Sequence, residues 1–337
     1  MGKITLEAIA KTIGVSKVSV YNALNDKKGV SEALRVKIKN HAKSLGYINK
    51  QSLIEAKNKK FLFFINQDFF LTPSEQYYST IFYFISAECN KNNSILQIAF
   101  IETENTIEKM KEVIAFFKPD GLFIVGEINT SIFKFTESIN IPTVFIDYYN
   151  PLFDSNFVYV DNYHLSYMIS NYLIAKGHKN IGFVGNINKT ASIADRYFGY
   201  LKALTAAKLP INNQWHININ LEKNEETGDV VDVVSTLPGE LPTAFICHCD
   251  AAAQRLYTIL ALKGLKVPDD ISIISFDNTP LCDNLMPKLT SAGPQKDYYA
   301  KKAFNLMIEC LNNKNKVFQK QIQTDLVERE SVKYIKE

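Results

Sequence analysis

The feature that most constrains this chain is a change in hydrophobic periodicity at Phe61. From there on, short apolar runs rich in β-branched and aromatic residues alternate with helix-length segments, in two successive series. Such runs are typical of parallel strands that helices cover on both faces. Two series predict an α/β protein with two doubly wound lobes and a cleft between them. The predicted strands are Phe61–Ile65, Ile95–Ile101, Gly121–Val125 and Thr143–Asp147, then Ile181–Val184, His216–Leu221, Thr243–Cys247 and Ile271–Phe276.

Helix-length segments separate these strands. In the first series they fall near 74–91, 105–117 and 130–139. In the second they fall near 162–176, 196–208, 225–236 and 250–264.

The residues before Phe61 have a different, helical pattern. Thr5 is a good N-cap, Gly14 ends the first helix, and Ser16 and Ser31 begin two more. The first and second helices, with the short turn between them, predict a helix-turn-helix unit, whose second helix, 17–24, enters the DNA major groove. We expect these helices to bury Leu6, Ile9, Ala10, Ile13, Val20, Ala23, Leu24, Leu34, Ile38, Ala42 and Leu45.

Charge is distributed unevenly between these two parts. The whole chain carries a formal charge of +3, but residues 1–60 contribute +9 and the remainder −6. Arg35 and twelve lysines supply the positive charge of the first part. A basic head on a mildly acidic body favours a polyanion as the partner of the head.

Other sequence properties exclude several classes. No apolar stretch reaches the roughly 18 residues of a membrane helix, and no secretory signal is visible, so we expect a cytoplasmic protein with no membrane partner. The five cysteines are scattered and odd in number, unlike a disulfide framework. Cys247 and Cys249 are too close for a Cys-x-x-Cys metal site, and alternation along a strand would place both thiols on one face. We therefore expect no metal.

The head and the body together resemble the LacI/GalR (lactose-repressor) family of transcription regulators. The resemblance rests on Thr5–Asn25, Val30–Ser31, Arg35 and Leu45–Tyr47 in the head, and on Lys176–Gly185, Arg196–Gly199 and Val267–Asp277 in the body. It implies a three-helix helix-turn-helix head and two α/β lobes of the periplasmic-binding-protein type. The implied divisions are a DNA-binding domain at 1–47, a hinge at 48–60 and an effector-binding and dimerisation domain at 61–337. The first lobe would be about 61–160 with 291–319, and the second about 161–290 with 320–337.

The resemblance also implies DNA contacts. In the family, the side chains at the positions of Lys17, Val18 and Asn22 read base edges. Asn22 stands where the family usually has arginine, and Tyr21 where it has serine. We therefore expect a preference for adenine over guanine at the base that Asn22 contacts. The full set of expected DNA-binding residues is Thr5, Ser16, Lys17, Val18, Ser19, Tyr21, Asn22, Asn25, Ser31, Lys50, Leu53, Ala56 and Lys57.

The hinge departs from the family pattern. Ala56 occupies the position of a leucine that wedges into the minor groove, and Asn49 replaces a proline. Leu53, one turn earlier, either takes over the wedge or packs against its mate in a dimer. Lys50 and Lys57 are placed for phosphate contacts.

An effector site is implied at the carboxyl ends of the strands. Asp147, Arg196 and Asp277 match family contacts, and carboxylates with an arginine suit the hydroxyl groups of a sugar. Each also has a structural interpretation, as a helix cap or a surface ion pair. The altered lining makes lactose-like galactosides a poor expectation. The expected effector-binding residues are Asp68, Phe69, Val125, Glu127, Asp147, Arg196, Cys249 and Asp277.

These patterns favour a homodimeric transcription regulator, expected to be a repressor, with operator DNA and a small sugar-like effector as partners. No catalytic residues and no cofactor are expected, because neither a dinucleotide fingerprint, a P-loop nor a nucleophile motif is present. Two alternatives remain open at this point. One is a sugar-binding protein without DNA function, and the other is a sugar-modifying enzyme.

Overall fold

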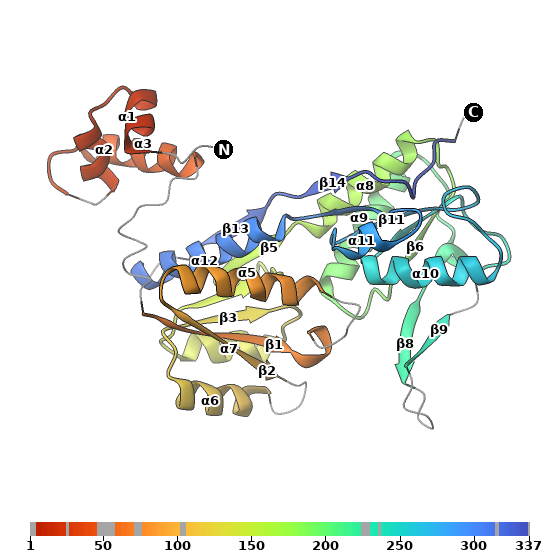
Figure 1. The fold of residues 1–337 in the computed structure, drawn as a ribbon, viewed down its shortest axis with the longest axis horizontal. Coiled ribbons are helices and arrows are strands. Elements are labelled where there is room, and N and C mark those ends of the chain that lie inside the picture. The colour runs from red at the N-terminus through yellow and green to blue at the C-terminus, as the bar shows by residue number, and fades with distance from the viewer. Residues whose placement is uncertain are drawn as a thin grey trace.

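A computed structural model describes residues 5–24, 27–45, 58–70, 76–101, 106–223, 230–234, 237–313 and 317–335. Of the side chains in these ranges, those of 43, 44, 68, 219–223 and 230–234 lie outside the description. Figure 1 shows three N-terminal helices and a long body made of two lobes.

Three helices form the head: α1 (Leu6–Ile13), α2 (Lys17–Leu24) and α3 (Glu32–Ser44). Their boundaries agree with the sequence prediction, because the expected caps are in place. Thr5 accepts a bond from the amide of Ala8, and Gly14 takes the left-handed conformation, with φ of 77°. The head core is made of Ile9, Ala10, Val20, Ala23, Ile38 and Ala42, with Leu6, Ile13, Leu24 and Leu34 partly buried against it.

One predicted core residue of the head is wrong. Leu45 is exposed, because it follows the last turn of α3 instead of lying on its buried face.

The first lobe is a six-stranded parallel sheet. Its strand order is β13-β5-β4-β3-β1-β2, and every pairing is parallel. Helices α5 and α12 cover one face, and α6 and α7 cover the other (Figure 1). The strands are β1 (Lys60–Asn66), β2 (Ile95–Ile101), β3 (Gly121–Val125), β4 (Thr143–Ile146), β5 (Asn156–Val160) and β13 (Gln319–Ile322). The helices are α5 (Tyr77–Lys91), α6 (Thr106–Phe117), α7 (Thr130–Ser138) and α12 (Lys296–Asn312), with a 3-10 turn η1 (Gln67–Phe69).

Burial in this sheet follows strand position. The central strands β1, β3 and β4 are almost completely buried, as their apolar sequences predict. The edge strand β2 is not covered on both faces as expected, and Ile95 is 55% exposed.

The second lobe has the same plan. Its strand order is β14-β12-β11-β10-β6-β7, parallel except for the antiparallel β14. The strands are β6 (Ile181–Val184), β7 (His216–Ile217), β10 (Ala244–Cys247), β11 (Ser272–Phe276), β12 (Thr290–Gly293) and β14 (Asp325–Val327). The helices are α8 (Asn162–Ala175), α9 (Ala191–Ala206), α10 (Asp250–Leu262) and α11 (Leu281–Asn284), with a 3-10 turn η2 (Asn213–Trp215).

A separate hairpin corrects two predictions. The expected strand His216–Leu221 is split between β7 and β8 (Ile219–Lys223), and the expected helix 225–236 is instead β9 (Val230–Val234). These two strands pair antiparallel and extend away from the second lobe (Figure 1). The run Val230-Val-Asp-Val-Val has the β-branched composition of a strand.

The chain passes between the lobes at positions slightly different from the expected ones. The first crossing lies after β5, which ends at Val160. The second falls after Gly293 instead of about 291, because β12 pairs with β11 in the second sheet. The third falls after Ile322 instead of about 319, because β13 pairs with β5 in the first sheet.

The architecture is therefore the α/β class that the sequence predicts, with a helical head and two parallel-sheet lobes. Among the described residues, no helix combines the length and the apolar character needed to span a membrane.

Candidate DNA-binding head and ligand cleft

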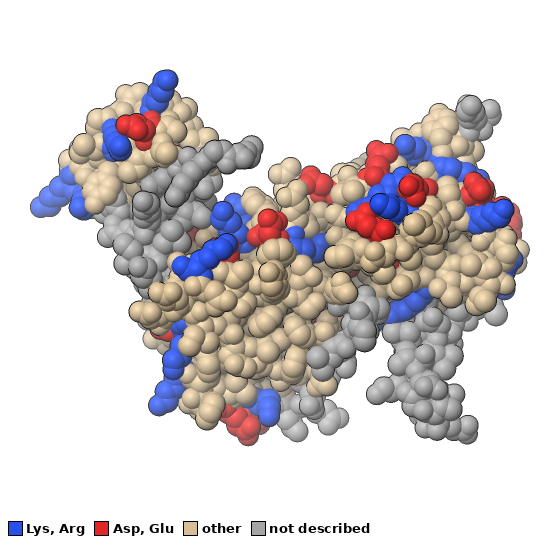
Figure 2. Space-filling view, in the orientation of Figure 1, with Lys and Arg blue, Asp and Glu red and all other residues tan. Residues whose placement is uncertain are grey.

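The outer face of α2 carries the side chains expected to read DNA. Val18 is 65% exposed and Tyr21 is 42% exposed, and Lys17 is also exposed. Asn22 is half-buried. The opposite face of the helix buries Val20 and Ala23 in the head core. On the outer face, the amino group of Lys27 lies over the ring of Tyr21 and donates to its hydroxyl at 3.3 Å, while Tyr21 stays exposed. Figure 2 shows lysine and arginine side chains at the outer edge of the head.

Three of the four expected serine and threonine contacts act as helix caps in this structure, and the fourth, Ser19, lies within α2. The hydroxyl of Ser16 accepts a hydrogen bond from the backbone amide of Ser19 at 3.0 Å. It also forms a hydrogen bond with the side-chain hydroxyl of Ser19 at 2.9 Å. Ser31 accepts from the amide of Leu34 at 3.4 Å. Helix N-termini are favourable positions for phosphate, so capping and phosphate contact are compatible at Thr5, Ser16 and Ser31. Asn25, Lys50, Leu53, Ala56 and Lys57 lie outside the described residues.

In the body, two aspartates occupy equivalent positions in the two lobes. Asp147 directly follows β4, and Asp277 directly follows β11. Each has a positive φ, 61° at Asp147 and 96° at Asp277, which aspartate tolerates better than most residues. Both carboxylates therefore lie at the carboxyl ends of parallel strands, where α/β proteins bind ligands.

A buried arginine pairs with the second of these carboxylates. Arg196, on α9, is 7% exposed. Its Nη2 lies 3.3 Å from Oδ1 of Asp277, its Nε donates to Asn162 Oδ1 at 2.8 Å, and its Nη1 donates to the carbonyl of His248. The guanidinium also lies over the ring of Phe276, 4.5 Å from the centroid. With an ion pair, hydrogen bonds and a ring fixing it, the guanidinium has a defined orientation beside the cleft.

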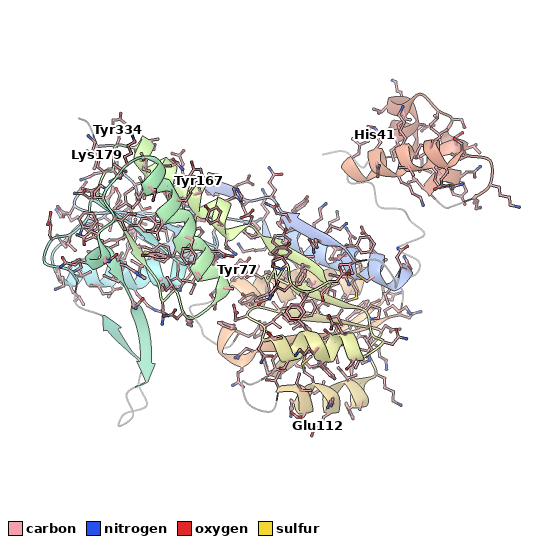
Figure 3. All side chains as sticks on the ribbon, turned by 180° about the vertical axis from the view of Figure 1, so that it is seen from behind. His41, Tyr77, Glu112, Tyr167, Lys179 and Tyr334 are labelled. Carbon is pink, nitrogen blue, oxygen red and sulfur yellow. The ribbon has the colours of Figure 1, made fainter. Side chains whose placement is uncertain are left out.

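Asp147 is held by tyrosines. Its carboxylate accepts bonds from Tyr78 at 2.8 Å and from Tyr77 at 3.3 Å, both at the start of α5. Figure 3 labels Tyr77, which lies where the two lobes meet. Burial raises the pKa of Asp147, against the opposing effects of Arg196 and the tyrosine bonds.

Asp277 is shifted in the same direction. Burial raises the pKa of Asp277 to about 6, although Arg196 favours its ionised form. The amino group of Lys296, from α12 of the first lobe, donates to the backbone carbonyl of Asp277. Gly293 leaves room for this arrangement, since a Cβ there would lie 2.8 Å from the carbonyl carbon of Asp277.

Two adjoining hollows lie between the lobes. The first contains Asp147, Arg196 and Asp277 and is lined besides by Phe69, Gln76, Tyr77, Tyr78, Lys189, Thr190, Ser192, Ile193, His248, Cys249, Asp250, Ala251 and Thr279. The second shares Phe69, Tyr78, Asp147, Thr190 and Ser192 with it. Its own residues are Glu127, Tyr148, Tyr149, Tyr159, Val160, Asp161, Asn162, Ala191 and Asp195.

The hollows bring together six of the eight expected effector residues: Phe69, Glu127, Asp147, Arg196, Cys249 and Asp277. Val125 is a correction. It is 2% exposed and belongs to the core of the first lobe, because its side chain points from β3 towards the covering helices. The side chain of Asp68 lies outside the description.

Glu127 joins the two lobes directly. Its Oε2 accepts a bond at 2.9 Å from the amide of Ala191, the first residue of α9. A carboxylate at a helix N-terminus is favourable electrostatically. Burial nevertheless raises the pKa of Glu127, and Asp195 raises it further, while the bond from Ala191 lowers it.

The residues before α10 have structural roles that correct part of the sequence interpretation. The N-cap of α10 is Cys249, whose sulfur accepts from the amide of Ala252 at 3.4 Å. Asp250 is 1% exposed and accepts bonds from Ser275, Thr279 and Ser291. β10 ends at Cys247, so Cys249 is not on the strand. Within the described residues, no cluster of His, Cys, Asp and Glu has the arrangement of a metal site.

Several cleft residues were missed from the sequence. Tyr77 and Tyr78 belong to a chain with 17 tyrosines, so their residue type alone carried no signal. Lys296 begins α12, a helix that the hydrophobic pattern did not predict, although it lies only 19 residues after Asp277.

Comparisons with known proteins agree with this architecture. Residues 170–332 match the family described as a periplasmic binding protein-like domain. The HTH-type transcriptional repressor PurR of Haemophilus influenzae (strain PittEE) is 30% identical over 344 residues, which cover 98% of this chain and 99% of the repressor. PurR of Vibrio parahaemolyticus is 26% identical, covering 98% of each chain.

Solved structures with the same fold cover between 82% and 98% of the chain. The transcriptional regulator CelR in complex with cellobiose has a TM-score of 0.67 at 18% identity, covering 97% of this chain and 99% of CelR. The lac repressor dimer bound to operator and an anti-inducer has a TM-score of 0.66 at 18% identity, covering 98% and 100%. A LacI family regulator from Enterococcus faecium with bound ribose has a TM-score of 0.68 at 20% identity, covering 82% and 100%.

Proposed function

The chain belongs to the LacI/GalR (lactose-repressor) family of DNA-binding transcription regulators, and we propose that it is a repressor whose operator binding is controlled by a small sugar-like effector. The PurR relatives, matched over almost their full length, are named transcriptional repressors, which supports repression over activation. We further propose that it binds a pseudo-palindromic operator as a homodimer, since two recognition helices one DNA turn apart read two half-sites.

The observation that carries the DNA-binding part is the outer face of α2. Val18 and Tyr21 are large side chains, yet both are exposed. Val20 and Ala23, on the opposite face of the same helix, are buried. A helix that leaves such residues outside a complete core has a surface suited to another molecule. The surplus of lysine in the head favours DNA as that molecule.

The effector part rests on the first hollow. Asp147 and Asp277 offer acceptors for hydroxyl groups, Arg196 offers donors, and Phe69 and Tyr78 offer ring faces. This combination suits a compact, polar ligand with many hydroxyl groups. Two structural neighbours are described with cellobiose and with ribose, which supports a sugar-like effector here.

One experiment tests the DNA-binding part. Genomic fragments retained by the full chain and by residues 61–337 would be sequenced and compared. We expect the full chain to enrich fragments with a shared pseudo-palindrome and the truncated chain to enrich none. Equal retention by both chains would contradict the assignment of DNA binding to the head. Asn22→Ala would then be measured on the enriched operator, where we expect a loss of discrimination at one base position per half-site, of about 1–3 kcal/mol.

A second experiment tests the effector part. Cellobiose and ribose would be titrated into the full chain and into Arg196→Met, with thermal unfolding as the readout. Lys202→Met, an exposed cation on the same helix, is the control. Stabilisation by either sugar that Arg196→Met abolishes and Lys202→Met retains supports the proposed site. Stabilisation that persists in Arg196→Met would place the ligand elsewhere.

A further inference from the structure

The only arginine of the first sixty residues forms bonds to the recognition helix from a neighbouring helix. Arg35 lies on α3, and its side chain is 12% exposed. Its Nη1 donates to the carbonyls of Asn22 at 3.1 Å and Ala23 at 3.5 Å. Its Nη2 donates to the carbonyls of Lys27 at 2.9 Å and Val30 at 3.4 Å. One guanidinium therefore binds the end of α2 and the segment that follows it.

The recognition helix needs such a partner. α2 has eight residues, and a helix of that length is not stable by itself in water. The last four carbonyls of any helix lack partners within it, and a cation at that end is favourable because of the helix dipole. Arg35 supplies both hydrogen-bond donors and a positive charge to the carbonyls of Asn22 and Ala23, although it belongs to α3.

The choice of residue type is informative. Every other basic residue in the first sixty is lysine, which is sufficient for phosphate contacts. Arg35 stands where donors must diverge in a plane to reach carbonyls on two segments, the end of α2 and the residues after it. A lysine ammonium is a compact point charge and does not reproduce that fork.

We propose that Arg35 is a positioning residue for operator recognition: by binding the carbonyl of Asn22 and the segment after α2, it sets the orientation in which α2 presents Asn22 and Tyr21 to the bases. This inference rests on the proposed DNA-binding function. The charge of Arg35 alone would indicate a phosphate contact. The inference assigns it a different role. Its partly buried guanidinium is committed to backbone carbonyls and to Glu32, 3.2 Å from Nε.

The test compares specific with non-specific binding. Full-length wild type would first select an operator from a random duplex pool. Affinity for that operator and for a scrambled duplex would then be measured by fluorescence anisotropy at several salt concentrations, for wild type, Arg35→Lys and Arg35→Met. Lys37→Met, an exposed cation on the same helix, is the matched control.

We expect Arg35→Lys to lower operator affinity at least tenfold while affinity for the scrambled duplex changes less than threefold. The salt dependence of operator binding should stay the same for Arg35→Lys, because no phosphate contact is lost. Lys37→Met should have a similar effect on both duplexes. Arg35→Met could lose binding to both duplexes because the head no longer folds, which circular dichroism would show. In that case the result for Arg35→Lys tests the inference.

Two results would overturn the inference. One is an equal loss on both duplexes with a salt slope reduced by about one, which is the signature of a phosphate contact. The other is unchanged operator affinity in Arg35→Lys. A wild type that selects no sequence at all would instead overturn the proposed function, and this inference with it.

Discussion

Asp277 combines an unusual backbone conformation with an unusual environment. Its φ of 96° turns the residue at the end of β11, where its carboxylate meets Arg196. Burial raises its pKa from 3.8 to about 6. Between these two values the folded protein binds a proton that the unfolded chain releases. The stabilising effect of this group is therefore fully present below about pH 4 and is lost as the pH rises through about 6.

This predicts a specific pH dependence for Asp277→Asn, which mimics the protonated group. The unfolding free energy of wild type relative to the variant should fall by on the order of 1–3 kcal/mol between pH 4.5 and pH 7.5. Urea denaturation at several pH values measures it. Asp269→Asn, which changes an exposed carboxylate, should show a smaller change and serves as control. A difference that does not vary with pH would mean that Asp277 has its ordinary pKa.

The site could be predicted from the sequence only in part, and the reason lies in the residue types. Asp147, Arg196 and Asp277 sit at strand ends or in a recognisable motif, so both pattern and family resemblance found them. Val125 also ends a strand, but its side chain faces the core instead of the cleft. Tyr78 lines the cleft and Lys296 contacts the backbone of Asp277, both from helices whose packing no local pattern specifies.

The Arg196–Gly199 motif lies on helix α9, where one residue faces the cleft and another packs against a neighbouring helix. Three residues apart, Arg196 faces the cleft while Gly199 faces α8. A Cβ at Gly199 would lie 2.2 Å from the carbonyl oxygen of Tyr163 and 2.9 Å from Cβ of Ser166. The absence of a side chain therefore lets α8 and α9 approach closely, and that contact fixes the position of Arg196.

Gly199→Ala should accordingly separate these helices. We expect it to destabilise the protein by about 1–3 kcal/mol, the typical cost of overpacking. Chemical denaturation measures this, with Lys202→Ala on the exposed side of the same helix as control. A stability equal to that of wild type would show that the helix contact yields without cost.

Glu127 of the first lobe contacts the N-terminus of α9 in the second lobe. The amide of Ala191 belongs to the first turn, so it has no acceptor within the helix, and Glu127 provides one from the other lobe. Glu127→Ala should therefore accelerate hydrogen exchange at Ala191 about tenfold or more, whereas Glu127→Gln, which keeps an acceptor, should have a smaller effect. Glu137→Gln, which changes an exposed carboxylate of the first lobe, is the control. Unchanged exchange in Glu127→Ala would mean that the lobes are apart at this point in solution.

Helices and strands could be predicted where their own residues carry a clear hydrophobic pattern. β1, β3 and β6 were found because they are apolar throughout. β12, Thr290-Ser-Ala-Gly, is fully buried although none of its residues is strongly apolar, because its hydroxyl groups bond within the fold. α9 begins at Ala191 instead of 196, since the cap at Thr190 precedes the apolar periodicity.

At the scale of the molecule, the two functions are carried by parts of opposite charge. The head is strongly basic and the body mildly acidic, so the polyanion partner is attracted to one part alone. The cleft, in contrast, is lined by carboxylates paired with cations or tyrosines at short range. Contacts of this kind are partly shielded from solvent ions. Operator binding and effector binding should therefore respond differently to ionic strength.

We expect the operator affinity of the full chain to fall about a thousandfold or more between 50 and 200 mM salt, because each lysine that neutralises a phosphate releases a counterion. Thermal stabilisation by a cleft ligand should change by only a few-fold over the same range. Fluorescence anisotropy measures the first and thermal unfolding the second. Residues 61–337 alone should retain the ligand response and show no operator binding. If operator affinity were insensitive to salt, the lysines of the head would not contact phosphates, and the charge asymmetry would have no part in recognition.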